Sequence, residues 1–205
     1  SRIPNGVVLP PLCASLPRQG AVRLLALGRL TEQKGGNILL EALGRLRARG
    51  VENELFLDFV GVGPQQEYWQ RLVRSYELEA QVNFRGSVSP AEVGRVLMET
   101  DILVMPSLYE GMPSVVLEAF AHGVPVIASQ VSGAEDVVVS ERGWLVPAGD
   151  SEALAQALLD ALRAGREQWR TMGQAGRSCV AKDYSVPVIA ERYLQLFAEL
   201  TTRDQ

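Results

Sequence analysis

Histidine and cysteine are scarce in this chain of 205 residues, and their scarcity argues against several kinds of site. Because His122 is the only histidine, a Ser-His-Asp triad or a histidine-based metal cluster has almost no material. The two cysteines, Cys13 and Cys179, lie far apart in the sequence. We therefore expect neither a disulfide framework nor a zinc site, and free thiols in the cytosol are the simplest interpretation.

Long apolar runs and an excess of positive charge are also missing. No apolar run approaches the roughly 20 residues of a membrane-spanning helix. The formal net charge of −4 argues against a broad nucleic-acid surface, so no nucleic-acid partner is expected, but it leaves room for a local cationic pocket. Repeats and low-complexity linkers are absent from the sequence as well. A chain of this length can bury a full core as one large domain or two small ones.

The sequence does contain a regular alternation of strand-like and helix-like segments. Six segments are apolar almost throughout, which favours a parallel sheet covered on both faces: residues 21–27, 54–60, 81–85, 101–105, 124–128 and 143–146. Helical patterns occupy residues 36–48, 64–76, 90–99, 114–122, 151–162, 164–182 and 186–200. Together they predict a Rossmann-like, doubly wound α/β fold with about six parallel strands and helices on both faces.

Local signals set the expected boundaries. Residues 1–20 are rich in proline, and we interpret them as a linker that enters a domain at residues 21–185, with a final helix at 186–205. Pro64 and Pro90 fall where proline favours the start of a helix. Asp150 and Ser151 offer an N-cap for the helix that follows the sixth strand.

The turn after the first expected strand carries glycine and two cations. In doubly wound folds ligands bind at the carboxyl ends of the strands, and Gly28 lets the backbone approach a ligand closely there. Arg29 and Lys34 follow before the next helix, and a guanidinium fork with an ammonium charge would neutralise a diphosphate. An exposed turn with ordinary surface charges is the alternative interpretation.

Glycines also end the second and third expected strands. Gly61 and Gly63 resemble a dinucleotide fingerprint without its third glycine, and a tight turn is the alternative explanation. Arg85 and Gly86 begin an open turn that would accept a flat base and bond its edge through the backbone. A plain strand end explains this second pair equally well.

The most informative segment follows the fourth expected strand. It carries Glu110, the turn 111–113, Ser114 as a candidate N-cap, and Glu118 one helical turn later on the same face. The free N–H groups of a helix N-terminus suit an anion, and two carboxylates flank them here. A nucleotide sugar, with phosphate in the middle and hydroxyls at both ends, would satisfy this arrangement. The alternative is a turn residue and a solvated helix residue.

That alternative is less favoured for Glu118, because its neighbours in the sequence are apolar and a buried carboxylate is costly without a partner. His122 precedes Gly123 and is expected at the helix C-terminus rather than as a catalytic base. The three tryptophans are expected in the core or an interface.

These motifs, in this order, resemble the C-terminal domain of a retaining glycosyltransferase of family 4 with the GT-B fold. The resemblance spans essentially the whole chain. The glutamate pair in its context is its most specific part, whereas the single glycine motifs are not specific. The matching stretches are residues 3–7, 28–30, 34–35, 61–64, 84–86, 106–113, 118–129 and 143–147.

The resemblance implies a domain that binds a nucleotide-diphosphate sugar as donor, with a UDP-sugar favoured and a GDP-sugar second. It implies that Arg29 and Lys34 hold the diphosphate, Glu118 the ribose, and the loop beginning at Glu110 the sugar. It gives Glu110, Arg29 and Lys34 the catalytic roles and assigns donor binding to Gly28, Gly61, Gly63, Arg85, Gly86, Gly111, Met112, Pro113, Ser114, Val115, Val116 and Glu118.

The implied chemistry needs no metal or other cofactor, because cations and the helix dipole stabilise the leaving diphosphate. The anomeric configuration is retained. The usual proposal for this type of enzyme is that the leaving phosphate assists the incoming hydroxyl, rather than that a residue such as Glu110 acts as nucleophile.

The sequence departs from the family pattern in two ways. Ser132 stands where a glycine is usual and Asp136 where a glutamate is usual, so we expect no catalytic role for this loop. Such an enzyme has two domains, and the acceptor is held mainly by the N-terminal one. The chain matches only the other, C-terminal domain. We expect the chain to bind donor without transferring, and its last helix to expose Tyr193, Leu196 and Phe197.

Other functions remain open at this point. A GT-B epimerase would need more acid and base groups, and a phosphorylase would need a pyridoxal-phosphate lysine where Lys34 and Lys182 are the only lysines. A nicotinamide-binding module and a non-catalytic nucleotide-binding domain are further alternatives. For the family, polysaccharide, lipopolysaccharide or glycolipid assembly is typical, which implies a cytoplasmic protein peripheral to the inner membrane.

Overall fold

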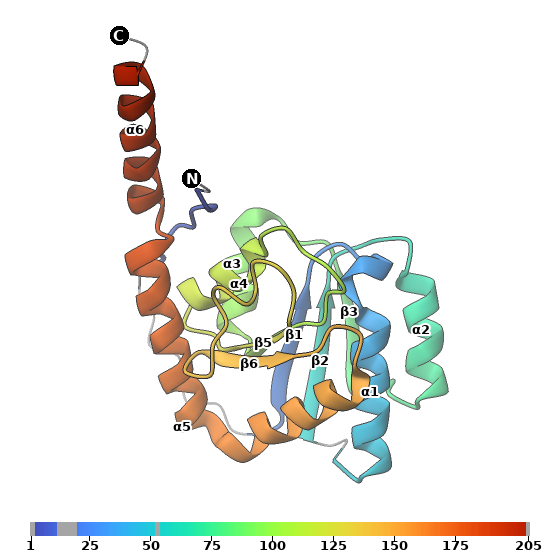
Figure 1. Ribbon diagram of the computed structural model, residues 1–205. Helices are drawn as coiled ribbons and strands as arrows, with labels where there is room; N and C mark the ends of the chain where they lie inside the picture. Colours follow the sequence, from blue (N-terminus) through green and yellow to red (C-terminus); the bar gives the residue numbers. More distant parts are fainter. Residues whose placement is uncertain (1–2, 12–19, 52–53, 204–205) are drawn as a thin grey trace.

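The computed structural model describes residues 3–11, 20–51 and 54–203, and within them one parallel sheet forms the centre of the molecule (Figure 1). Its strand order is β3-β2-β1-β4-β5-β6, the order of the Rossmann fold. The strands are β1 (Val22–Leu27), β2 (Leu55–Val60), β3 (Val82–Gly86), β4 (Ile102–Met105), β5 (Val126–Ser129) and β6 (Gly143–Val146). The predicted fold class is therefore confirmed.

Helices connect the strands and cover both faces of the sheet. They are η1 (Glu32–Lys34), α1 (Gly36–Ala48), α2 (Gln66–Ser75), α3 (Pro90–Met98), α4 (Ser114–Ala121), α5 (Ser151–Asp183) and α6 (Val186–Arg203). α3 begins at Pro90 as predicted, and the Glu92 carboxylate accepts the Ser89 N–H (2.8 Å). α2 begins two residues after Pro64, because Gly63 and Pro64 belong to the preceding turn.

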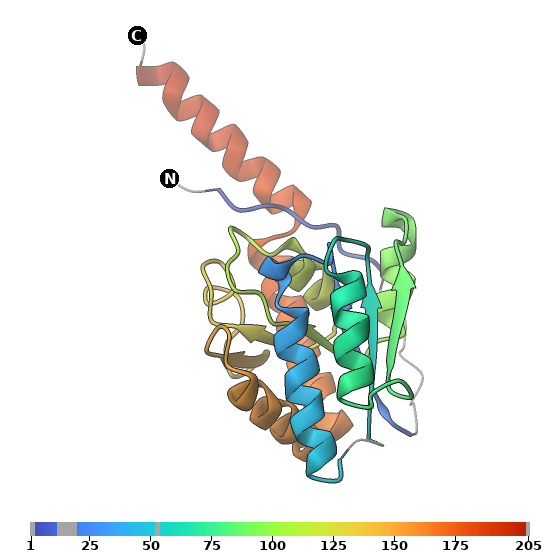
Figure 2. The same cartoon turned by 90° about the vertical axis from the view of Figure 1, so that its right-hand side faces the viewer.

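Each face of the sheet has its own apolar core. α1, α2 and α5 as far as Trp169 pack on one face, where Trp69 and Trp169 are buried and Trp144 packs, partly buried, against the same cluster. α3, α4 and Val180 near the end of α5 pack on the other face, around Phe120. Figure 2 shows α2 and α3 on opposite sides of β2 and β3. The tryptophans therefore serve the core, as predicted.

A kink at Gly165 allows α5 to serve both faces. Gly165 has φ 73° and ψ 171°, so the helix breaks there into the two arms that the sequence predicts as separate helices. Asp150 caps the first arm as predicted, because its carboxylate accepts the Ala153 N–H (2.9 Å). The second arm turns upward along the edge of the sheet in Figure 1.

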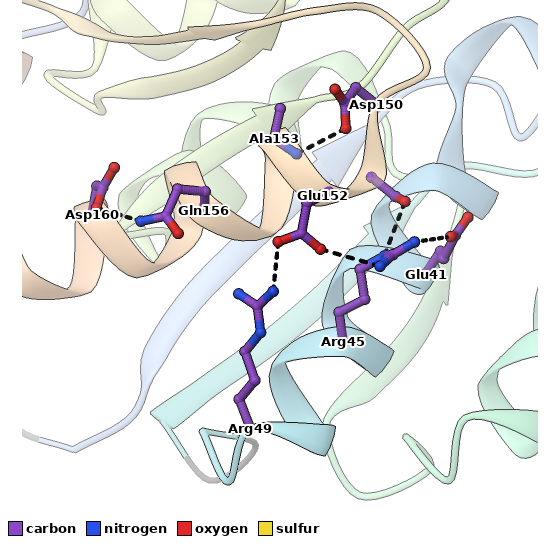
Figure 3. Close-up of polar contacts among 9 residues, drawn as sticks. Glu41, Arg45, Arg49, Asp150, Glu152, Ala153, Gln156 and Asp160 are labelled. Carbon is purple, nitrogen blue, oxygen red and sulfur yellow. Dashed lines mark hydrogen bonds and ion pairs between the residues drawn. The ribbon is translucent and has the colours of Figure 1, made fainter.

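Charged residues tie the start of α5 to α1 (Figure 3). The Arg45 guanidinium donates to the Ser151 hydroxyl (3.2 Å), to Glu152 (3.1 Å) and to Glu41 (2.8 Å). Arg49 donates to the other oxygen of Glu152 (2.5 Å). The charged side chains are 40–52% exposed, so solvent screens each pair and the network mainly fixes how the two helices lie.

The N-terminal segment and α6 meet at one side of the domain. The Val7 N–H donates to the Tyr184 carbonyl (2.9 Å), and the Val186 N–H donates to the Val7 carbonyl (3.1 Å). Beyond this contact α6 extends away from the domain (Figures 1 and 2). Of the predicted exposed side chains, Tyr193 and Phe197 are exposed, whereas Leu196 is only partly exposed. No helix among the described residues is both long and apolar enough to span a membrane.

Candidate functional site

A small pocket lies at the carboxyl ends of β1 and β4. Residues of β1, η1, β2, α2 and β4 and of the turns after β1 and β4 line it: residues 26–30, Lys34, Phe59, Trp69 and residues 104–107. The cations Arg29 and Lys34 therefore lie at the same pocket as Pro106 and Ser107. These two residues begin the loop of residues 106–113 between β4 and α4, which we call the Glu110 loop. Parallel strands place their carboxyl ends at one edge, which explains why sequence-distant turns meet here.

The turns that contain Gly28, Gly61 and Gly86 lie next to one another at this edge of the sheet. The Gly28 N–H donates to the Val60 carbonyl (2.9 Å), and the Gly61 N–H donates to the Gly86 carbonyl (2.8 Å). A β-carbon on Gly61 would lie 1.9 Å from the Gly28 oxygen, and one on Gly63 would lie 2.3 Å from the Leu30 oxygen. Close packing between turns therefore requires both glycines, whether or not a ligand is bound.

Arg29 and Lys34 differ in their surroundings. Arg29 is exposed at the strand end. The Lys34 ammonium lies 2.6 Å from Oε1 of Glu110, whose side chain is only 9% exposed. The structure thus brings together two of the three predicted catalytic side chains directly, although 76 residues separate them in the chain.

Two further residues hold the Glu110 loop, and the sequence analysis did not identify either of them. The Ser107 hydroxyl donates to Oε1 of Glu110 (2.7 Å). Gln33 bonds the loop twice, since its carbonyl accepts the Leu108 N–H (2.8 Å) and its side-chain amide donates to the Tyr109 carbonyl (2.9 Å). The available signal for Ser107 was a serine two residues after an apolar strand and three residues before a carboxylate.

The turn 111–113 leads into α4 differently from the prediction. Ser114 is not the N-cap: Pro113 has the extended N-cap conformation, and Ser114 is the first helical residue, with no side-chain cap. The Val116 N–H donates to the Pro113 carbonyl (3.0 Å), so this amide already has a partner. The Asn5 N–H donates to the Met112 sulfur (3.0 Å), which connects the N-terminal segment to this turn.

The loop after β5 packs against the same turn. A β-carbon on Gly133, which has φ +79°, would lie 2.8 Å from the Gly111 oxygen and 3.2 Å from the Met112 Cα. The neighbouring Ser132 and Asp136 are exposed. The loop after β5 therefore packs directly against the backbone of the 111–113 turn and restricts its position.

Glu118 lies one turn into α4 and is half-buried. Loss of hydration raises the pKa of its carboxyl above the ordinary value, and the nearby His122 lowers it by a smaller amount. His122 ends the helix, and its Nδ1 lies 2.8 Å from the Glu118 carbonyl oxygen, so the predicted C-terminal position is confirmed. A half-buried carboxylate of this kind is suited to accept ligand hydroxyls, which would offset its lost hydration.

Arg85 has other partners than a ligand. Its guanidinium lies 3.1 Å from Glu99 and 3.4 Å from Asp58, and the side chain is mostly buried. The main chain beside it is more open, because Gly86 has φ +73° and a β-carbon there would meet nothing within 4 Å. Any contact of this turn with a ligand would therefore come from its backbone.

The cysteines and the acidic residues form no further site in the described part of the chain. Cys179 is a free thiol, as expected, and burial raises its pKa. Cys13 lies outside the described residues. Within residues 3–11, 20–51 and 54–203, no group of three or more histidine, cysteine, aspartate or glutamate side chains is placed to hold a metal ion.

Comparison with known proteins identifies the family. Residues 14–178 match the model of the glycosyl transferases group 1, which covers most of the chain, and the chain belongs to this family. It is 30% identical over 182 residues to the putative colanic acid biosynthesis glycosyltransferase WcaL of Salmonella typhimurium, covering 85% of this chain and 44% of the relative. The chain thus spans about half the length of the curated relatives it matches.

Solved glycosyltransferases share its fold. Sucrose-phosphate synthase from Thermosynechococcus elongatus superimposes with a TM-score of 0.85 at 31% identity, over 98% of this chain and 52% of that chain. The Anabaena protein HepE, solved in complex with UDP, superimposes with a TM-score of 0.80 at 21% identity, over 88% of this chain and 49% of that chain. The six-stranded Rossmann-like domain described above is thus a glycosyltransferase fold.

Proposed function

We propose that this chain is the C-terminal, donor-binding domain of a retaining GT-B glycosyltransferase of family 4. It binds a nucleotide-diphosphate sugar, with a UDP-sugar first and a GDP-sugar second, for transfer of a hexosyl group. The observation that carries the proposal is the meeting of Arg29, Lys34 and the Glu110 loop at one pocket, directly before the N-terminus of α4.

The diphosphate is bound by cations and by the start of α4. Arg29 is exposed and offers a planar fork, and Lys34 lies beside it at the pocket. The N-terminus of α4 adds its partial positive charge, which stabilises the diphosphate most when it leaves with its full charge. This chemistry requires no metal or cofactor.

Donor binding requires Lys34 to change its partner. In the structure its ammonium is paired with Glu110 at 2.6 Å. When a phosphate takes that charge, Glu110 becomes an acceptor for the hydroxyls of the donor sugar, while Glu118 accepts the ribose hydroxyls. The pair thus holds two ligand-binding groups together and separates them as the donor enters.

The acceptor is held by an N-terminal domain of a longer polypeptide. The chain spans about half the length of its relatives, which leaves room for such a domain. α6 extends from the domain and exposes Leu194 and Phe197, so we propose that it crosses to that partner domain. On this account the 205-residue chain binds donor but does not transfer, and detectable transfer by it would contradict this part of the proposal.

The names of two relatives support the proposed pathway. Two of them are named for colanic acid and lipopolysaccharide core biosynthesis. We propose that the longer protein assembles a polysaccharide, lipopolysaccharide or glycolipid in the cytoplasm, peripheral to the inner membrane. A non-catalytic nucleotide-binding domain is the competing function, and it predicts binding of nucleotide without any contribution from a donor sugar.

Calorimetric titration of the 205-residue chain with UDP, GDP and ADP tests the proposal. We expect one nucleotide to bind, and Arg29→Ala and Glu118→Ala to weaken it about tenfold or more, because each removes a charged hydrogen-bonding partner. Arg163→Ala is the matched control, because this side chain lies at the end of the first arm of α5 and is 72% exposed, and it should leave the affinity unchanged. Binding that is insensitive to both substitutions, Arg29→Ala and Glu118→Ala, would place the nucleotide elsewhere and overturn the proposal.

A further inference from the structure

Ser107 is a buried hydroxyl placed against a functional carboxylate. It lies two residues after the end of β4 and its side chain is fully buried, with 0% of the residue exposed. Its Oγ donates to Oε1 of Glu110 (2.7 Å), and the Lys34 ammonium bonds the same oxygen (2.6 Å). Among the described residues, these two bonds are the ones made to the Glu110 carboxylate, and both end on Oε1.

Gln33 and Gly35, which lie between β1 and α1, fix the backbone on either side of Ser107. Gln33 bonds the main chain of Leu108 and of Tyr109. Gly35, with φ +64°, lies so close to the Pro106 carbonyl that a β-carbon would come within 2.0 Å of its oxygen. Because these contacts hold the loop on both sides of Ser107, its hydroxyl is a fixed point rather than a mobile side chain.

The two partners of Glu110 differ in what ligand entry does to them. Lys34 is a flexible side chain, 29% exposed, and a phosphate attracts its charge. Ser107 lines the same pocket, but it is neutral and fully buried, and its hydroxyl already donates to Glu110, so a phosphate has no charge to attract there. Once Lys34 leaves, the serine hydroxyl is the contact that continues to hold Oε1, which leaves Oε2 as the oxygen available to a ligand hydroxyl.

We propose that Ser107 is a positioning residue for donor-sugar recognition: it holds Oε1 of Glu110 so that Oε2 accepts a hydroxyl of the donor sugar. The inference rests on the proposed function, because it concerns the sugar part of a nucleotide-sugar ligand. It separates the sugar from the nucleotide: Ser107 acts on the sugar through Glu110, whereas Arg29 and Glu118 act on the nucleotide.

The test compares a nucleotide with its own sugar derivative. The affinities of UDP and UDP-glucose, and of GDP and GDP-mannose, are measured for the wild type, Ser107→Ala and Ser107→Thr. For the pair that the wild type binds, we expect Ser107→Ala to leave the nucleotide within about twofold and to weaken the nucleotide sugar by at least about fivefold. Ser107→Thr keeps the hydroxyl and should restore most of that loss.

Ser151→Ala is the matched control. It removes a comparably buried hydroxyl, but one that accepts a hydrogen bond from Arg45 and has no contact with Glu110. It should leave both affinities unchanged. A variant Ser107→Ala that weakens nucleotide and nucleotide sugar equally, or neither, overturns the proposal.

Crystal structures of Lys34→Ala and of the double variant Lys34→Ala/Ser107→Ala supply a readout that does not depend on the ligand, because Lys34 no longer holds the same oxygen in either. We expect the Glu110 carboxylate to stay on Ser107 in Lys34→Ala and to rotate away in the double variant, and a carboxylate in the same position in both would overturn the inference. If the wild type binds none of the four ligands, the proposed function fails, and these structures still decide whether Ser107 positions Glu110.

Discussion

At the scale of single residues, the two glutamates of the site are held in opposite ways. Glu110 is compensated by a cation and a hydroxyl at 2.6 and 2.7 Å. Glu118 is half-buried, and burial raises the pKa of its carboxyl. A group in this second condition weakens the folded state when it is ionised, which makes it suited to a ligand that supplies hydrogen bonds.

Glu118→Gln should therefore stabilise the free protein at neutral pH. The folded-state pKa of Glu118 lies above the ordinary 4.5, so the folded protein keeps this proton to higher pH than the unfolded chain. Its contribution to the free energy of unfolding falls as pH rises above 4.5 and stays low once the carboxyl is ionised. We expect the Tm of Glu118→Gln to exceed that of the wild type at pH 7.5 and to equal it near pH 4. A difference of equal size at both pH values would contradict this.

Gly35→Ala should destabilise the turn that precedes α1. Alanine at φ +64° costs about 1–2 kcal/mol, and the contact of its β-carbon with the Pro106 oxygen at 2.0 Å adds an overpacking cost of about 1–3 kcal/mol. Gly50→Ala is the control, since Gly50 has φ +76° but nothing within 4 Å of its β-carbon. Urea unfolding should show a clearly larger decrease in the free energy of unfolding for Gly35→Ala than for Gly50→Ala. Equal decreases would contradict this and mean that the turn can move away from Pro106.

At the scale of elements, α5 provides a matched pair of aspartates (Figure 3). Asp150→Ala removes the cap on the Ala153 N–H and should lower the free energy of unfolding by about 1 kcal/mol. Asp160→Ala, on the exposed face of the same helix, loses surface contacts with Gln156 and Arg163 and should cost less than about 0.5 kcal/mol. Chemical denaturation distinguishes the two values, and the reverse order would contradict the assigned cap.

Among the helices and strands, most of the fold could be predicted from the sequence, but two features of the site could not. The strands are short apolar runs, so their positions and the fold class follow from the pattern; β4, expected at residues 101–105, is Ile102–Met105. The start of α4 could not be decided, because proline and serine both suit a helix start, and here Pro113 takes the N-cap and Ser114 the first turn. The pairing of Lys34 with Glu110 was also hidden, since it depends on the conformation of two loops that meet only in the folded protein.

At the scale of the whole molecule, α6 has one anchored end and one exposed end. Ile189 is 6% exposed and packs against Gly6, whereas Leu194 is 69% and Phe197 59% exposed. In the 205-residue chain, Leu194→Glu and Phe197→Glu should each change the free energy of unfolding by less than about 0.5 kcal/mol, and Ile189→Glu should cost about 2 kcal/mol or more.

The same substitutions should behave differently in a longer protein. If α6 crosses to a partner domain there, Phe197→Glu becomes strongly destabilising, because it places a charge in an apolar interface. Equal and small effects in both proteins would show that the exposed face of α6 stays uncovered.

The central claim is that a nucleotide diphosphate binds at the pocket that Arg29 and Lys34 line together with the first residues of the loop that leads into α4. A crystal structure of the chain with UDP tests it most directly. We predict the diphosphate between the two cations, with Lys34 withdrawn from its 2.6 Å contact with Glu110. UDP bound elsewhere, for example in the groove between β6 and α5 lined by Trp144 and Gln156, with the Lys34–Glu110 pair intact, would contradict the account.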